Sequence, residues 1–153
     1  MHKKLNDILS NKKIFEKIID ETILALERYK TTTHAKILGI LFVETFINNN
    51  FTKDEYNTLL FSIELMHPTL GINCLKNFYD CKIDLDNEKN EVKKDEIFVK
   101  RSNIDYSPLT NTSLLKLPVG GTYFDNPGGA SINDLGYKFY RLVISKIINE
   151  KII

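Results

Sequence analysis

Apolar residues recur at helical spacing along the first third of the chain. Over residues 5–29 they fall at intervals of three and four, on one face of a helix that Ser10 and Asn11 could interrupt. Residues 34–47 carry apolar side chains on most sides, which predicts a second, largely buried helix. A run of threonines before it suits an N-cap, and three asparagines at 48–50 end it.

A capping box predicts the start of a third helix. Thr52 and Glu55 stand three residues apart, the spacing at which each side chain can bond the backbone N–H of the other. The apolar residues that follow predict a helix over residues 53–66. Pro68 suits the first turn of a fourth helix, over residues 68–80, because that position needs no backbone N–H. The buried stripe of this fourth helix is then Leu70, Leu75, Phe78 and Tyr79.

The next segment, residues 82–96, is the most charged part of the chain. It holds six acidic residues and four lysines, with few apolar residues to bury, which predicts an exposed charged loop. Four of its acids match positions of a calcium-binding loop, but Lys89 stands where that loop needs glycine, so we interpret them as solvated. A short apolar run at 97–99 predicts a strand after the loop.

Glycine pairs shape the C-terminal part. A Gly-Gly turn joins the apolar segments 114–118 and 122–124, the pattern of a β-hairpin. After a second Gly-Gly pair, an amphipathic pattern predicts a last helix over residues 132–149, with Ser131 and Asp134 capping its start.

These elements predict a mainly α fold, a helical bundle with a small C-terminal β-hairpin, with an α+β fold as the alternative. At 153 residues, 42% of them hydrophobic, the chain is long enough to bury one core. We therefore expect a single domain over residues 1–153. Its parts are a helical part at 1–81, the charged loop at 82–96, and the hairpin with the last helix at 97–153.

The C-terminal pattern resembles the ending of winged-helix proteins. There a short motif closes the β-hairpin, or wing, and starts a terminal helix, and Ser131-x-x-x-Leu135-Gly136-x-x-Phe139 is similar to it. The order of elements also resembles helical proteins of bacterial prophages and abortive-infection defence. The winged-helix resemblance implies nucleic-acid binding. The residues argue against nucleic-acid binding. The helix before the hairpin carries one lysine, Lys76, and the wing holds an acidic residue, Asp125, and no basic residue.

Charge and composition narrow the possible partners. Twenty-one basic and 20 acidic residues leave a net charge of +1, so no global field favours nucleic acid or an anionic membrane. The only dense basic group is Lys93, Lys94, Lys100 and Arg101. No apolar run reaches the ~20 residues of a membrane helix, and the first residues do not form a secretory signal, so we expect a soluble cytoplasmic protein. Apolar C-terminal isoleucines favour a homodimer.

Candidate chemistry is sparse. His67, Cys74 and Cys81 recur every seven residues, but ~10.5 Å of helical rise between neighbours is too long for one zinc ion, so we expect buried thiols. His34 and Glu44 flank the apolar second helix, where burial could raise the pKa of a carboxyl group. We favour the interpretation of Glu44 as a snorkelling or hydrogen-bonded polar group of the core. The spacing of these residues along the sequence indicates no catalytic residue, no metal site and no cofactor. A hydrolase or nuclease would require His34 or His67 to meet carboxylates in a cleft.

Aromatic residues near the C-terminus are the best candidates for a functional surface. Tyr123 and Phe124 are adjacent on the predicted hairpin, so one of them points outward unless both pack under the charged loop. Tyr137 and Tyr140 lie off the apolar stripe of the last helix. We therefore predict a non-enzymatic cytoplasmic protein-interaction module, such as a prophage or phage-defence regulator or inhibitor. The alternatives are a nucleic-acid-binding regulator that uses the basic group and an unrecognised hydrolase or nuclease.

Overall fold

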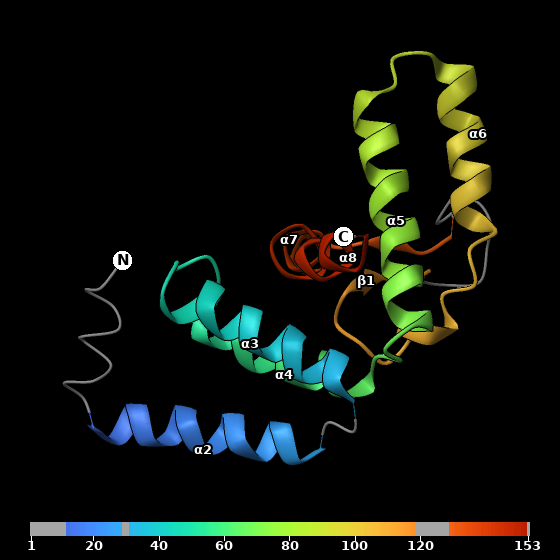
Figure 1. Ribbon diagram of the computed structural model, residues 1–153. Helices are drawn as coiled ribbons and strands as arrows, with labels where there is room; N and C mark the ends of the chain where they lie inside the picture. Colours follow the sequence, from blue (N-terminus) through green and yellow to red (C-terminus); the bar gives the residue numbers. More distant parts are fainter. Residues whose placement is uncertain (1–11, 29–30, 119–128, 153) are drawn as a thin grey trace. The chain divides into compact units, whose positions relative to one another are not determined.

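The computed structural model describes residues 12–28, 31–118 and 129–152 (Figure 1). It is mainly helical, with a small two-stranded antiparallel sheet near the C-terminus, so the predicted fold class is confirmed. The elements are α2 (Lys12–Arg28), α3 (Thr32–Phe46), α4 (Lys53–Leu65), α5 (Leu70–Asn87), α6 (Glu91–Ser102), the 3-10 turn η1 (Ser107–Leu109), β1 (Leu115–Lys116), β2 (Ser131–Ile132), α7 (Asp134–Phe139), the π-helical turn η2 (Tyr140–Ile144) and α8 (Ser145–Ile152).

The chain divides into two compact units. The first lies within residues 1–64 and 142–153, and the second is residues 65–141. The chain passes between them twice, after α4 and within η2. Among the described residues, none of the helices has the length and apolar character that crossing a membrane requires.

The first unit is built from α2, α3, α4 and α8 around a core of apolar side chains. Tyr56 of α4 is fully buried, and its ring meets that of Phe46 edge to face at 4.9 Å between centroids. Its hydroxyl lies 2.8 Å from Thr22 Oγ1 on α2, which links the two helices. The other fully buried large side chains of this unit include Ile37, Leu38, Leu41, Leu59 and Ile63.

Both predicted helix starts of the first unit are confirmed. Thr31 caps α3, its hydroxyl accepting a hydrogen bond from His34 N at 3.2 Å. The capping box of α4 is complete, since Thr52 N donates to Glu55 Oε1 at 2.9 Å and Glu55 N donates to Thr52 Oγ1 at 3.1 Å. These bonds satisfy backbone donors that a helix start leaves without partners.

A buried carboxylate holds α3 against α8. The Glu44 side chain is 3% exposed and accepts hydrogen bonds from Asn48 at 3.2 Å, from Asn50 at 2.6 Å and from Lys146. Burial alone would raise the pKa of Glu44, but these donors and the Lys146 charge outweigh it and hold the pKa below 4.5. The favoured interpretation of Glu44 as a hydrogen-bonded polar group of the core is therefore confirmed. The alternative of a raised pKa is wrong, because Lys146 reaches Glu44 from a distant part of the sequence.

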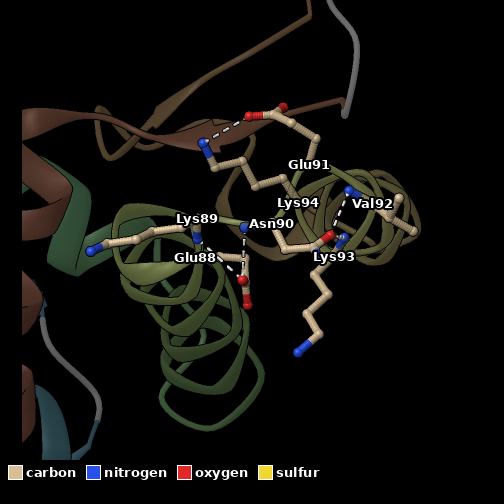
Figure 2. Close-up of polar contacts among 7 residues, drawn as sticks. All are labelled: Glu88, Lys89, Asn90, Glu91, Val92, Lys93 and Lys94. Atoms are coloured by element: carbon tan, nitrogen blue, oxygen red, sulfur yellow. Dashed lines mark hydrogen bonds and ion pairs between the residues drawn. The ribbon is translucent and has the colours of Figure 1, made fainter.

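In the second unit, α5 and α6 form an antiparallel pair where the charged loop was expected (Figure 1). The expectation of a loop over residues 82–96 and a strand over 97–99 is wrong, since only 88–90 connect the two helices. Figure 2 shows that Glu88 Oε1 accepts from the N–H groups of Lys89 and Asn90 at 3.1 and 3.0 Å.

The connection continues into an N-cap that starts α6. Asn90 Oδ1 accepts from Val92 N at 3.0 Å and from Lys93 N at 3.2 Å. On α5, ion pairs spaced by four residues support the charged turns, with Lys82 Nζ 3.2 Å from Asp86. The charged residues therefore form solvated faces of two helices, and their predicted exposure is largely confirmed.

The β-hairpin has a different second strand from the one expected. Leu115 pairs with Ile132 and Lys116 with Ser131, so Ser131 belongs to β2 and does not cap the last helix. The expected strand at 122–124 lies outside the described residues. The cap is Asn133, whose Oδ1 accepts from Gly136 N at 2.7 Å.

A close approach fixes the start of the last helix. A Cβ atom on Gly136 would stand 2.2 Å from Leu114 O, so only glycine fits at this position. Asn133 bonds the same segment, donating from its backbone N to Leu114 O at 3.1 Å and from Nδ2 to Ser113 O at 2.8 Å. Before the hairpin the order of elements differs from the predicted one, because α6 and η1 stand between α5 and β1.

We expect Glu44→Gln to destabilise the protein by about 1–3 kcal/mol near neutral pH, because the bonds to a charged acceptor weaken. Since the folded-state pKa is lowered, the Glu44 contribution is present above about pH 4.5 and is lost as the pH falls through the folded-state pKa. Urea unfolding of the wild type and of Glu44→Gln, near pH 7 and near pH 3, measures the difference in their free energies of unfolding. The stability difference should shrink in acid, and a difference that stays constant would contradict the assignment.

Replacement of Gly136 by alanine should destabilise the second unit by about 2 kcal/mol or more, because the added methyl group meets a backbone oxygen. Gly39→Ala is the matched control. Gly39 lies within α3, where an added Cβ meets nothing within 4 Å, so alanine should stabilise by about 0.5–1 kcal/mol. Thermal unfolding of the two variants should shift in opposite directions, and equal shifts would refute the packing argument.

Candidate interaction surface

Three tyrosines meet where α5 and α7 lie together in the second unit. The ring of Tyr79, on α5, stacks on that of Tyr137, on α7, with 5.1 Å between centroids and 26° between planes. Tyr140 also lies against Tyr79, at 4.3 Å. Tyr137 and Tyr140 share a side of the helix because they stand three residues apart. Both tyrosines expected on the surface of the last helix therefore converge on a third.

Two cations lie over the same ring. Lys82 Nζ is 5.5 Å from the centroid of Tyr137, and Arg141 Cζ is 5.9 Å from it. Both distances fall within the ~6 Å range of cation–π attraction. The spacing of the helices explains the arrangement, since Lys82 stands three residues after Tyr79 and Arg141 four after Tyr137. We call Tyr79, Lys82, Tyr137 and Arg141 the aromatic–cation surface.

The tyrosines differ in how much of each ring reaches solvent. Tyr140 is 6% exposed, so it supports Tyr79 from the interior, whereas Tyr79 and Tyr137 are half-buried. Burial raises the pKa of Tyr79, with a further rise from Tyr137, and burial also raises the pKa of Tyr140 despite the opposing charge of Lys76. The phenols of Tyr79 and Tyr140 therefore stay protonated at neutral pH and can donate hydrogen bonds.

The remaining predicted site residues are not gathered in this way. Tyr123 and Phe124 lie outside the described residues. Lys93, Lys94, Lys100 and Arg101 all lie on α6, among acidic residues. Lys94 is 3.4 Å from Glu91 (Figure 2), and Arg101 lies 5.1 Å from the centre of the Phe98 ring, where burial lowers its pKa. Lys93 lines a hollow together with Asp84, Glu88 and Glu96, so acidic side chains lie beside this basic residue.

The two histidines that the structure describes, His34 and His67, take structural positions. His34 Nδ1 lies 2.8 Å from Thr31 Oγ1 at the start of α3, about 15 Å along that helix from Glu44, so the expected pair does not meet. His67 Nδ1 accepts from Thr69 N at 3.1 Å and from Leu70 N at 3.0 Å, before the first turn of α5. Sequence reasoning missed this cap because histidine is rarely used in that role.

The two thiols are buried, as predicted, and both are free. Burial raises the pKa of Cys74 to about 11, with a smaller contribution from Asp105, whose backbone oxygen accepts from the thiol at 3.4 Å. Burial also raises the pKa of Cys81. Within the described ranges, His, Cys, Asp and Glu side chains do not group into threes that could hold a metal ion.

Comparison with family models, with curated proteins and with solved structures finds no match.

Both thiols should react slowly with a maleimide near neutral pH while the protein is folded. A pKa of about 11 in place of 9.0 lowers the thiolate fraction of Cys74 roughly 100-fold, and burial limits access further. Mass spectrometry after timed labelling of the Cys81→Ser variant isolates Cys74. Labelling should become fast in denaturant, and fast labelling of the folded variant would contradict the burial.

Proposed function

We propose that this protein is a non-catalytic interaction module that binds a partner protein through the aromatic–cation surface. The observation that carries the proposal is the half-exposed ring of Tyr137, stacked on Tyr79 and flanked by the charges of Lys82 and Arg141. Tyrosine and arginine are the residue types that most often dominate binding energy in protein interfaces. A cytoplasmic regulator or inhibitor is the class of protein that we propose.

The stacking favours binding because it orders the side chains in advance. Tyr137 is held by Tyr79, and Tyr79 in turn rests on the buried ring of Tyr140. Side chains that are already ordered lose less conformational entropy when a partner binds. The residues also come from α5, α7 and the π-helical turn η2, so helical segments and not loops support the contact.

The chemistry of the surface indicates what the partner presents. Arg141 is exposed and Lys82 is partly exposed, so both can reach acidic groups outside the chain. The tyrosine rings offer apolar area between these charges. A partner segment that places a carboxylate next to an apolar or aromatic side chain therefore complements the surface, because each of its groups meets an opposite charge or a ring.

The Tyr137→Ser variant should lose a partner that the wild-type protein retains. The tagged protein captures partners from native lysate at high salt after nuclease treatment, and mass spectrometry identifies what stays bound in stoichiometric amount. Loss of a central aromatic contact should weaken binding about 30-fold or more. Arg141→Ala should weaken it less, because its charge lies at the edge of the surface.

Tyr106→Ser is the control for this experiment. Tyr106 is a half-buried tyrosine of the same unit that lies before η1 and is not one of the three tyrosines in mutual ring contact. The Tyr106→Ser variant should retain the partner, and circular dichroism should show that every variant is folded. Retention of the partner by Tyr137→Ser would refute the proposed surface.

Nucleic-acid binding is the second candidate, and the same cluster favours it. Aromatic rings beside cations are also the groups on which single-stranded bases stack. Titration of a labelled oligothymidine, followed by fluorescence anisotropy at several salt concentrations, tests this function. Binding that weakens as salt rises and that requires both Tyr137 and Arg141 would favour it, whereas absence of binding leaves the protein-interaction function as the conclusion.

A further inference from the structure

A second surface, in the first unit, is a groove between α2 and α4. The groove has a volume of about 280 Å³, and each helix contributes residues three or four positions apart, so the groove follows one side of both helices. Its lining is Glu21, Leu24 and Ala25 from α2, and Asn57, Leu60, Phe61 and Glu64 from α4.

The groove exposes large apolar side chains to solvent. Phe61 is 62% exposed and Leu24 is 51% exposed, on opposite walls, while Ala25 between them is buried. Neighbouring apolar side chains that remain this exposed gain free energy when another apolar surface covers them. The apolar area therefore favours a docked partner but does not by itself say which kind.

A carboxylate in the groove indicates the chemistry of that partner. Glu21 Oε2 is buried and has no hydrogen-bond partner among the residues that the structure describes. Its other oxygen lies 3.9 Å from Lys17 Nζ, which is too long for a hydrogen bond. Buried polar atoms are nearly always paired in folded proteins, so this oxygen is a candidate site for a donor that a bound partner supplies. Glu64, on the opposite wall, adds a second negative charge.

We propose that this groove binds an amphipathic helix of a partner protein, whose apolar side chains cover Leu24, Leu60 and Phe61 and whose lysine or arginine donates to Glu21. An open groove between two helices matches the shape of a helix, which can place apolar and basic residues on one face. The groove is separate from the aromatic–cation surface, because all of its residues belong to the first unit. The protein would thus hold two partners, or two segments of one partner.

A displayed library of amphipathic helices of about 15 residues, with its apolar face randomised, tests the proposal. The library is selected on the wild-type protein and depleted on the Phe61→Ser variant. Enriched sequences should carry lysine or arginine at one fixed position of the apolar face. Enrichment without a basic residue, or no enrichment, would overturn the proposal.

An enriched peptide then measures the roles of individual residues. The chain has no tryptophan, so one tryptophan in the peptide reports its own burial by fluorescence. Glu21→Gln should weaken binding about 10-fold and should reduce the preference for the lysine peptide over its glutamine counterpart. Val92→Ser is the matched control, because Val92 is 68% exposed in the other unit, and it should bind as the wild type does.

Two further outcomes would overturn the proposal. If Glu21→Gln binds the lysine peptide as tightly as the wild type does, the Glu21 carboxylate does not recognise a basic side chain of the partner. If the wild-type chain forms dimers in analytical ultracentrifugation and Phe61→Ser abolishes them, the occupant of the groove is a second copy. Phe61 and Glu21 both reach solvent, so these variants should fold, and circular dichroism checks that they do.

Discussion

The aromatic–cation surface depends on how closely the last helix approaches strand β1. At Gly136 the helix passes so near Leu114 O that no side chain fits between them, and Asn133 bonds the same backbone segment from both its main chain and its side chain. Tyr137 follows Gly136 directly, so this contact also determines where its ring lies. Since α5 packs against β2, which pairs with β1, the sheet places Tyr79 within stacking distance of Tyr137.

The length of α5 is the second requirement for this surface. Had the helix ended near residue 80, as the charge pattern of the next segment suggests, Lys82 would not stand one turn after Tyr79. Composition misleads here because a solvated helix needs only a narrow buried side, and Cys81 and Leu85 are enough to supply one. Ion pairs at spacing four, such as Lys76 with Asp80 at 2.6 Å, add local support to a helix of charged residues.

Much of the fold could be predicted from the sequence, whereas the site could be predicted only in part. Local signals were reliable, as the capping box at Thr52 and the stripe of the last helix show, because they involve neighbours in the chain. Tyr137 was also found from its position off that stripe. Tyr79 was assigned to the core, and Lys82 was missed, because their contacts with Tyr137 join residues more than fifty positions apart. The contact of Lys146 with Glu44 was missed for the same reason, because the two residues stand 102 positions apart.

Two carboxylates of the first unit, the buried Glu44 and the partly exposed Glu21, show how a structural acid differs from one that is suited to binding. The carboxylate of Glu44 is fully hydrogen-bonded within the chain, since two asparagines and Lys146 donate to it and keep it ionised. Its charge therefore stabilises the packing of α3 and α8 and offers nothing to a partner. Glu21 has a buried oxygen to which none of the described residues donates, and it lies beside exposed apolar side chains. A buried polar atom without a hydrogen bond costs folding free energy. The presence of such an oxygen in the groove is explained best by a donor that a bound partner supplies.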